Sequence, residues 1–333
     1  MNPLLSVCIP TLNRPKYLMD ALQSIIREVN GFKDIEVCVS NNCSMLNYDV
    51  VEKFIENHEF IHYERQPNEI TLDENMHRTV SIATGEYIYL LGDDDYFLEG
   101  GLIQIFALID ELKPDLSIIN GINVNDDGEY ISRLFLDREI TFDNFYDAYK
   151  YHNNHCMFGA ILVKRTYLQK NLFIAFYGTS HAYMSFWASL AMKNFISKKP
   201  IIVYTPAHPI VALRATNKTY SSYFLDALYL HMPMWFYILM RFVDDRQSRR
   251  LIMKIANNNF SVIFSLRFLA GLRLAGVDIK SIAYYPPAQL SVLVKLKLTL
   301  IAYLHPKAIT AAVFILKIFK SILFLILSRR KYD

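Results

Sequence analysis

The sequence predicts an α/β protein with a mostly parallel, Rossmann-like sheet that has helices on both faces. Two observations predict this class: short apolar runs typical of strands alternate with amphipathic stretches of helical period, and polar clusters follow several of the runs. A third observation is that the chain becomes apolar and basic from about residue 221. We therefore expect two domains, an α/β domain at 1–220 and a helical region at 221–333.

Composition excludes several classes of protein. The 333 residues are 53% hydrophobic and 20% charged, which is typical of a folded chain. The four cysteines have neither CxxC nor zinc-site spacing, so we expect reduced thiols in a cytosolic compartment. The N-terminal residues MNPLLSVCIPT lack the basic start and long apolar core of a signal peptide. The basic tail is too apolar for a nucleic-acid platform, so we expect no nucleic-acid partner.

The first part of the chain alternates between strand and helix. Buried strands are expected at the apolar runs Leu4–Pro10, Ile35–Val39, Phe60–Glu64 and Tyr87–Leu91. Helices are expected at Val50–Asn57 and at Pro15–Val29, where Pro15 suits the first helical position. A further helix is expected at Thr71–Thr84. Thr71 and Glu74 have capping-box spacing, and Gly85 can serve as the C′ residue that ends this helix.

The alternation continues after the fourth run. Helices are expected at Leu102–Leu112 and Phe142–Tyr151, and strands at Leu116–Val124 and Phe158–Val163. A turn is expected at Asp126–Gly128. Pro114 follows the first of these helices, and helices end before a proline because it disfavours helical backbone in the residue that precedes it. Strands that alternate with helices form a largely parallel sheet.

The most informative stretch is EYIYLLGDDDYF, from Glu86 to Phe97, in which three aspartates directly follow a predicted strand. Three adjacent carboxylates repel one another, and a divalent cation would remove this repulsion. Mg²⁺ and Mn²⁺ prefer oxygen ligands, and Mg²⁺ commonly binds one or two carboxylates together with substrate phosphates. The alternative is a solvated acidic turn that ends the strand.

Three polar clusters follow predicted strands, at Thr11–Arg14, Ser40–Ser44 and Asp93–Asp95. The carboxyl ends of parallel strands share one edge of a sheet, where ligands bind in open α/β sheets. We therefore expect the three clusters to line one crevice with the geometry of a nucleotide site.

The segments SVCIPTLNRP, VCVSNNCS and ATGEYIYLLGDDD resemble the N-terminal half of family 2 glycosyltransferases, which have the GT-A fold. The resemblance covers roughly residues 4–100 strongly and 100–215 weakly. It implies transfer of a sugar from a nucleotide-diphosphate donor to a hydroxyl acceptor. It also implies that Asp95, with Asp93 or Asp94, holds Mg²⁺ or Mn²⁺ at the diphosphate.

The resemblance implies further donor contacts. Pro10, Thr11 and Arg14 would line the base and ribose pocket. Asn41 and Asn42 stand where relatives usually carry an aspartate that contacts the nucleotide, so this contact would lack a charge. Arg65, Asn68 and Asn75 stand where relatives place further contacts, with ordinary loop and helix-surface polarity as the alternative.

The resemblance leaves the general base to be identified. Inverting relatives usually carry a Glu-Asp pair downstream, but the corresponding segment here is GTSHAY, which has no carboxylate. His181 is the nearest candidate, since the pKa of an ordinary histidine lies near neutrality. A structural or acceptor-contacting histidine is the alternative, and the absent carboxylate leaves the stereochemical outcome open. His152 and His155 are more simply interpreted as structural, although His155 could reach the acceptor side.

Within the family, the VSNNCS and GTSHAY segments are similar to O-antigen transferases of 3,6-dideoxyhexoses. This narrower resemblance implies CDP-abequose as donor and an undecaprenyl-diphosphate-linked oligosaccharide as acceptor. A second hypothesis is a non-catalytic, membrane-recruited scaffold that retains a nucleotide-sugar pocket. A nucleotidyltransferase is a further alternative, but the first polar cluster has no Gly-rich phosphate loop.

The C-terminal region predicts membrane association. Ile279–Tyr332 contains nine Lys or Arg residues and no Asp or Glu, and Ala308–Leu327 is 20 residues long. Its 13 Ile, Leu, Phe and Val residues favour insertion by about 6 kcal/mol, but Lys317 and Lys320 oppose it by about 5–7 kcal/mol. We therefore prefer a helix lying at the membrane surface over a spanning helix or a packed helical domain. Together with the lipid-linked acceptor that the resemblance implies, this predicts a peripheral protein at the cytoplasmic face of the bacterial inner membrane.

Overall fold

The structure is a computed structural model that describes residues 2–29, 34–135, 138–153, 155–214, 232–263, 265, 269–270, 292–305 and 307–309. The chain divides into two compact units, of which the first comprises Met1–Ser221 and Met234–Ile252 and the second Ser222–Pro233 and Met253–Asp333. All the strands of the described residues lie in the first unit. Most of the predicted helix Ala308–Leu327 lies outside the described residues.

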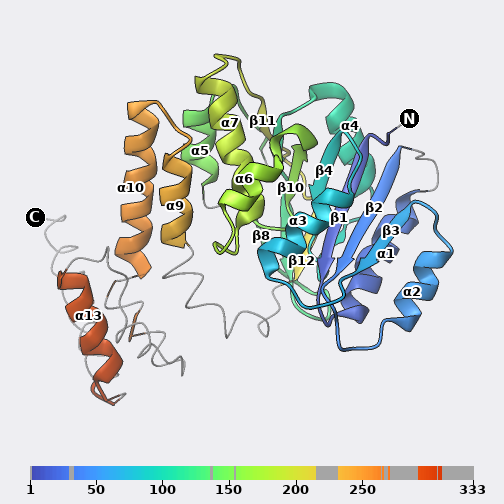
Figure 1. The fold of residues 1–333 in the computed structure, drawn as a ribbon, viewed down its shortest axis with the longest axis horizontal. Helices are drawn as coiled ribbons and strands as arrows, with labels where there is room; N and C mark the ends of the chain where they lie inside the picture. The colour runs from blue at the N-terminus through green and yellow to red at the C-terminus, as the bar shows by residue number, and fades with distance from the viewer. Residues whose placement is uncertain are drawn as a thin grey trace, which may run out of the picture. The chain divides into compact units, whose positions relative to one another are not determined.

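An eight-stranded sheet with the order β3-β2-β1-β4-β10-β6-β11-β9 forms the centre of the first unit (Figure 1). Its first four strands are parallel: β1 (Leu5–Thr11), β2 (Ile35–Asn41), β3 (Ile61–Arg65) and β4 (Tyr87–Leu90). The others are β6 (Leu116–Ile118), β9 (Ile140–Phe142), β10 (Ile161–Lys164) and β11 (Val203–Thr205). β10 is antiparallel to both β4 and β6, so the parallel arrangement holds for the first half and the whole sheet is mixed.

Helices cover both faces of the parallel strands, which explains their nearly continuous apolar sequence. All seven positions of β2 are buried, as expected for a strand covered on both sides. The helix α3 (Leu72–Ile82) packs on β1 and β2, whereas α1 (Pro15–Val29) packs with α2 (Asp49–Glu56) and α4 (Gly101–Leu112). These helices and the four parallel strands confirm the predicted alternation.

A second sheet has the order β5-β12-β7-β8, with β5 at Tyr96–Phe97, β7 at Gly121–Val124, β8 at Tyr130–Arg133 and β12 at Val211–Arg214. The prediction of one strand over Leu116–Val124 was wrong, because β6 and β7 belong to different sheets. Asn120 makes the break: its side chain donates to Ala207 O and accepts from Gly121 N. The second sheet begins directly after the three aspartates.

The capping box of α3 is present as predicted. Thr71 Oγ1 accepts from Glu74 N, and the Glu74 carboxylate accepts from Thr71 N. Gly85 does not serve as the C′ residue, because the helix ends at Ile82 and Ala83 is extended. Glycine is required at 85 for a different reason, since an added Cβ would lie 2.5 Å from Ser6 Oγ.

The remaining helices of the first unit come late in the chain. They are α5 (Phe145–His152), the short 3-10 helices η1 (Arg165–Tyr167) and η2 (Ala182–Ser185), α6 (Lys170–Ala175), α7 (Phe186–Phe195) and α9 (Met232–Met240). α5 begins three residues later than Phe142–Tyr151 predicted, because Phe142 belongs to β9 and Asn144 caps the helix. Beyond α9 lie α10 (Arg246–Ile263) and α13 (Val292–Tyr303). Among the described residues, no helix is both long and apolar enough to span a bilayer.

Candidate active site

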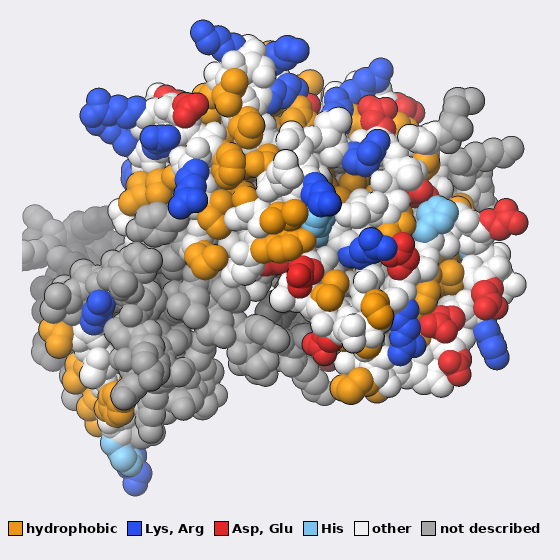
Figure 2. All heavy atoms as spheres, in the orientation of Figure 1, with side chains coloured by type: hydrophobic (Ala, Val, Ile, Leu, Met, Phe, Trp, Pro, Cys, Tyr) orange, Lys and Arg blue, Asp and Glu red, His pale blue; other side chains and the backbone are white. Residues whose placement is uncertain are grey.

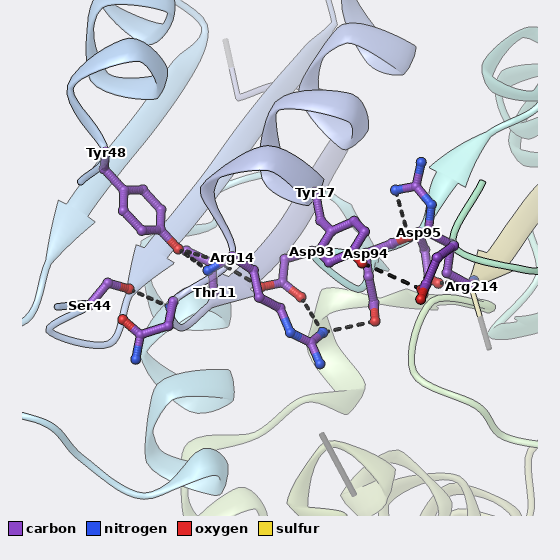
Figure 3. Close-up of polar contacts among 11 residues, drawn as sticks. Thr11, Arg14, Tyr17, Ser44, Tyr48, Asp93, Asp94, Asp95 and Arg214 are labelled. Atoms are coloured by element: carbon purple, nitrogen blue, oxygen red, sulfur yellow. Dashed lines mark hydrogen bonds and ion pairs between the residues drawn. The ribbon is translucent and has the colours of Figure 1, made fainter. Parts of the chain in front are cut away.

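The ends of β1, β2 and β4 meet at one edge of the sheet, as the three polar clusters predicted (Figure 3). Thr11 Oγ1, at the end of β1, donates to Asp93 Oδ2 at 2.8 Å across 82 residues of sequence. The second cluster joins the first, because Asn42 N donates to Thr11 O at 2.9 Å and Asn13 N donates to Ser44 Oγ at 2.8 Å. All three clusters therefore contribute to one connected polar surface.

Arg14 lies between two of the aspartates. One guanidinium nitrogen, Nη1, is 3.0 Å from Asp93 Oδ1 and 2.8 Å from Asp94 Oδ2. The arginine backbone is fixed as well, because Arg14 N donates to Tyr48 Oη at 2.9 Å. Tyr48 Oη also hydrogen-bonds Thr11 Oγ1, so one buried tyrosine positions both Thr11 and Arg14.

Burial changes the electrostatics of the aspartates. Burial raises the pKa of Asp93 to about 6, although the neighbouring Arg14 charge and the Thr11 hydrogen bond act in the opposite direction. Burial and the charge of Asp94 raise the pKa of Asp95 well above its usual range. Two of the three carboxylates are thus held where a negative charge is unfavourable without a nearby cation.

Asp95 faces the interior and contacts a residue that the sequence analysis missed. Its Oδ1 accepts from Arg214 N at 3.1 Å. The Arg214 guanidinium lies 5.1 Å from the ring centre of Tyr17 and 5.0 Å from that of Tyr96, and it pairs with Asp20 at 2.8 Å. In the sequence, Arg214 is a lone arginine at the end of an apolar run, so only the pairing of β12 with β5 identifies it.

The amides of the second cluster have partners within the protein. Asn41 Nδ2 donates to Tyr63 Oη, and the Asn42 side chain both donates to and accepts from the backbone of Ile70. Asn75 exchanges hydrogen bonds with Ser40, which ties α3 to β2. These contacts order the loops around the edge, and the predicted nucleotide contacts of Asn41, Asn42 and Asn75 stay predictions.

The remaining predicted donor contacts lie around the same edge. Arg65 Nη2 donates to Ser44 O at 2.6 Å, and Pro10 is in β1 one residue before Thr11. Asn68 is exposed in the loop before α3. All four cysteines are free thiols; Cys8, Cys38 and Cys156 are buried, whereas Cys43 in the second cluster is partly exposed.

His181 lies in the loop before η2, next to Tyr183. Its ring lies 6.0 Å from that of Tyr183, and Tyr183 Oη donates to Cys156 O at 3.0 Å. Three residues further along, Gly159 packs against Asp95, because a Cβ on this glycine would lie 2.0 Å from Asp95 Oδ2. These contacts fix the Tyr183 hydroxyl on the segment that precedes Gly159, and the role of His181 as a base stays a prediction.

His152 and His155 belong to an aromatic cluster with Phe135. His152 is fully buried, and its Nε2 lies 3.2 Å from Thr205 Oγ1. Burial and the charge of His155 lower the pKa of His152 to about 3, so it is neutral in the folded protein. This environment agrees with the structural interpretation of His152.

The three carboxylates suit a hard divalent cation, because their donor atoms are all oxygens and two of them are buried. In the part of the chain that the structure describes, no three His, Cys, Asp or Glu side chains form a metal site on their own. The side chain of Asp94 is 16% exposed, more than the 8% of Asp93. These residues fit a cation that also takes ligands from a substrate, and the pair Asp93 and Asp95 stays a prediction.

Comparisons with known proteins agree with this geometry. Residues 6–172 match the model of the family described as Glycosyl transferase family 2. The chain belongs to this family. Enzymes of the family generally use divalent cations.

Two relatives illustrate the range of the family. The chain is 36% identical over 112 residues to abequosyltransferase RfbV of Salmonella typhimurium, covering 32% of this chain and 33% of the relative. It is 33% identical over 116 residues to GalNAc(5)-diNAcBac-PP-undecaprenol beta-1,3-glucosyltransferase of Campylobacter jejuni, covering 33% of this chain and 35% of the relative. The matches thus span about a third of these relatives.

Among solved structures, TarS 1-349 of Staphylococcus aureus in complex with UDP has a similar fold. The TM-score is 0.61, with 90% of this chain and 87% of that chain covered. The identity is 16%, so this likeness shows a common fold and no more.

Proposed function

We propose that this protein transfers a sugar from a nucleoside-diphosphate donor to a hydroxyl group of a lipid-linked saccharide. One observation carries the proposal: Thr11, Arg14, Asp93 and Asp94 form a single hydrogen-bonded network at the carboxyl ends of β1 and β4. Nucleotide ligands bind at this position in open α/β sheets. Membership of glycosyl transferase family 2 supports the reaction class.

We assign the donor diphosphate to Arg14 and the aspartates. Asp94 and Asp93 would hold the divalent cation, since the Asp94 carboxylate is the more exposed and both contact the same guanidinium. The bound cation would stabilise the negative charge that develops on the leaving nucleoside diphosphate. Arg14 supplies a positive charge at the same place and can pair with a phosphate oxygen once the aspartates have another partner.

Asp95 has a different part in this scheme from the one that the sequence suggested. Its carboxylate accepts the backbone N–H of Arg214 and packs against Gly159, so it joins the aspartate segment to β12. We therefore assign Asp95 to holding the shape of the site and Asp94 to the cation, and the predicted pair of Asp93 and Asp95 as cation ligands is the alternative.

The acceptor hydroxyl needs a group that takes its proton, and we assign this role to His181. In the neutral ring, Nδ1–H donates to Thr179 O at 2.8 Å, which leaves the lone pair on Nε2. The Nε2 lone pair can therefore accept the proton of a hydroxyl group.

The named relatives support a narrower proposal. Abequosyltransferase RfbV and an undecaprenol-linked glucosyltransferase are both similar to this chain, so we propose CDP-abequose as the donor and an undecaprenyl-diphosphate-linked oligosaccharide as the acceptor.

An acceptor of this kind requires contact with a membrane, and we propose peripheral binding at the cytoplasmic face of the inner membrane. The basic, carboxylate-free stretch Ile279–Tyr332 supports this proposal. On the first unit, hydrophobic side chains lie among Lys and Arg over α6 and α7 (Figure 2). Exposed members of this region include Ile174, Ile196, Lys198 and Lys199.

The test is nucleotide release from a panel of UDP-, GDP-, dTDP- and CDP-sugars with membrane-extracted lipid-linked acceptor and Mg²⁺ or Mn²⁺. We expect turnover with a CDP-sugar, its loss in EDTA, and a fall in kcat of at least about 100-fold in Asp94→Asn. Asp127→Asn is the matched control, because Asp127 lies on an exposed turn, and it should turn over normally.

Each alternative predicts a different result. Turnover that persists in EDTA and in Asp94→Asn would remove the metal role from the aspartates. Nucleotide binding without turnover with any donor would instead favour the non-catalytic scaffold.

A further inference from the structure

Asp73, in the first turn of α3, binds a loop that is more than 100 residues away in sequence. Its Oδ2 accepts from Gly178 N at 2.9 Å and from Ser180 N at 3.0 Å, and its Oδ1 accepts from Ala182 N at 3.0 Å. The residue is only 3% exposed. A buried carboxylate is tolerated when its oxygens receive several hydrogen bonds, and here three backbone N–H groups of one short loop supply them.

The loop has an unusual backbone that needs this support. Gly178 and Ser180 have φ values of +82° and +57°, in the left-handed region that residues other than glycine rarely adopt. The bound N–H groups alternate along the chain, so the loop curves around the carboxylate. Thr179 is thereby held between two residues that Asp73 binds, and it is fully buried.

Thr179 in turn fixes His181. Thr179 O lies 2.8 Å from His181 Nδ1, and His181 N donates to Thr179 Oγ1 at 3.2 Å. A carbonyl oxygen only accepts hydrogen bonds, so Nδ1 carries the proton in the neutral ring. The orientation and the tautomer of His181 therefore depend on a threonine whose position depends on Asp73.

We infer that Asp73 is a positioning residue that holds the loop 178–182 and thereby presents Nε2 of His181 to the acceptor hydroxyl. The inference rests on the proposed function of His181, but its structural part can be tested separately. Asp73 does not touch the reacting atoms in this scheme. It acts through the backbone of Gly178, Ser180 and Ala182.

The experiment compares Asp73→Asn with the wild-type full-length chain. Asparagine has the same shape, but its NH₂ group cannot accept the N–H groups that one carboxylate oxygen binds. We expect kcat to fall by about tenfold or more, with the KM for the donor within about twofold of wild type. In ¹⁵N spectra of histidine-labelled protein, we expect His181 to lose its Nδ1-protonated signature, which a His181→Asn spectrum assigns.

Asp115→Asn is the matched control. Asp115 is 4% exposed and accepts from Tyr167 Oη, Lys193 Nζ and Ile202 N, but it precedes β6, where no predicted site residue lies. It should lower the melting temperature and leave both the kcat and the His181 signature unchanged. If Asp73→Asn does not fold, Asp73→Glu replaces it, since it keeps the charge and moves the carboxylate by one methylene group.

A wild-type kcat together with a retained Nδ1-protonated signature in the Asp73 variant would overturn the inference. If the wild-type chain turns over no donor, the proposed function fails, and the spectrum still decides whether Asp73 sets the tautomer. If the wild-type chain turns over and the variant differs only in melting temperature, the positioning role alone fails.

Discussion

Gly159 occupies a position that any side chain would disturb. Its φ is +100°, and an added Cβ would lie 2.0 Å from Asp95 Oδ2 and 2.7 Å from a methyl carbon of Leu213. Asp95 also holds the backbone of Arg214. The shape of the aspartate segment therefore depends on a residue without functional groups, located 64 residues after Asp95 in the sequence.

We expect Gly159→Ala to lower the free energy of unfolding by about 2–4 kcal/mol, because it combines a strained backbone with overpacking against Asp95. Urea denaturation measures the change. Gly128→Ala is the control, since Gly128 also has a positive φ, of +85°, but its nearest neighbour would be 3.4 Å away. That variant should cost about 1 kcal/mol, and equal losses in the two proteins would contradict the overpacking argument.

His152 makes the stability of the fold depend on pH. Its pKa is lowered from 6.5 to about 3 by burial and by His155, so the unfolded chain binds a proton at a higher pH than the folded protein. The stabilising contribution is complete above about pH 6.5 and is lost as the pH falls towards 3. At pH 5 we expect a loss of about 2 kcal/mol relative to pH 8, measured by urea denaturation. His152→Gln should remove this part of the pH dependence, and an unchanged pH profile would exclude His152 as its source.

At the scale of elements, α3 joins the sheet to both sides of the site. The capping box stabilises the first turn of α3, and Asn75 hydrogen-bonds Ser40 in β2. Asp73 accepts hydrogen bonds from the loop before η2. The start of α3 therefore affects more than the helix itself. A displaced first turn would move Asp73 away from the three backbone groups that it accepts.

We expect Thr71→Ala to lower the free energy of unfolding by about 1 kcal/mol, because Glu74 N loses its side-chain acceptor. Thermal unfolding measures the effect. Thr71→Ser keeps the hydroxyl and should stay within about 0.5 kcal/mol of wild type. A similar loss in both variants would show that the methyl group of Thr71, and not the cap, accounts for the change.

The elements that the sequence predicted well are those with a local signal. The helix Pro15–Val29 and the capping box at Thr71 are determined by periodicity and by residues within one turn, and the structure has both. The three clusters at the ends of strands were predicted because parallel strands share an edge. The split of Leu116–Val124 and the contacts of Arg214 and Asp73 could not be predicted, because each depends on partners about 90 to 190 residues away.

At the scale of the whole molecule, the charge is unevenly distributed. The net charge of the chain is +3, yet Ile279–Tyr332 alone carries nine Lys or Arg residues and no Asp or Glu. The rest of the chain is therefore acidic overall. An anionic surface would therefore attract the basic stretch Ile279–Tyr332 and repel the rest of the chain.

We expect the full-length chain to co-sediment with vesicles of phosphatidylglycerol and phosphatidylcholine, and to bind at least about tenfold less to phosphatidylcholine alone. Raising the salt from about 0.05 to 0.5 M should release part of the bound protein, because it screens the basic residues. A chain with Lys317→Glu and Lys320→Glu should bind less to the anionic vesicles. Equal binding to both vesicle types at all salt concentrations would contradict an electrostatic contribution.

The four cysteines differ in their exposure to solvent, and the one in the second polar cluster is the most accessible to reagents. Cys8 and Cys38 face each other in neighbouring strands and are buried, as is Cys156, whose pKa burial raises to about 12. Cys43 is the partly exposed thiol and lies in the second polar cluster. Thiol reagents should therefore modify the native protein mainly at Cys43. A fluorophore placed there would test the proposed donor binding at this cluster without any engineered cysteine.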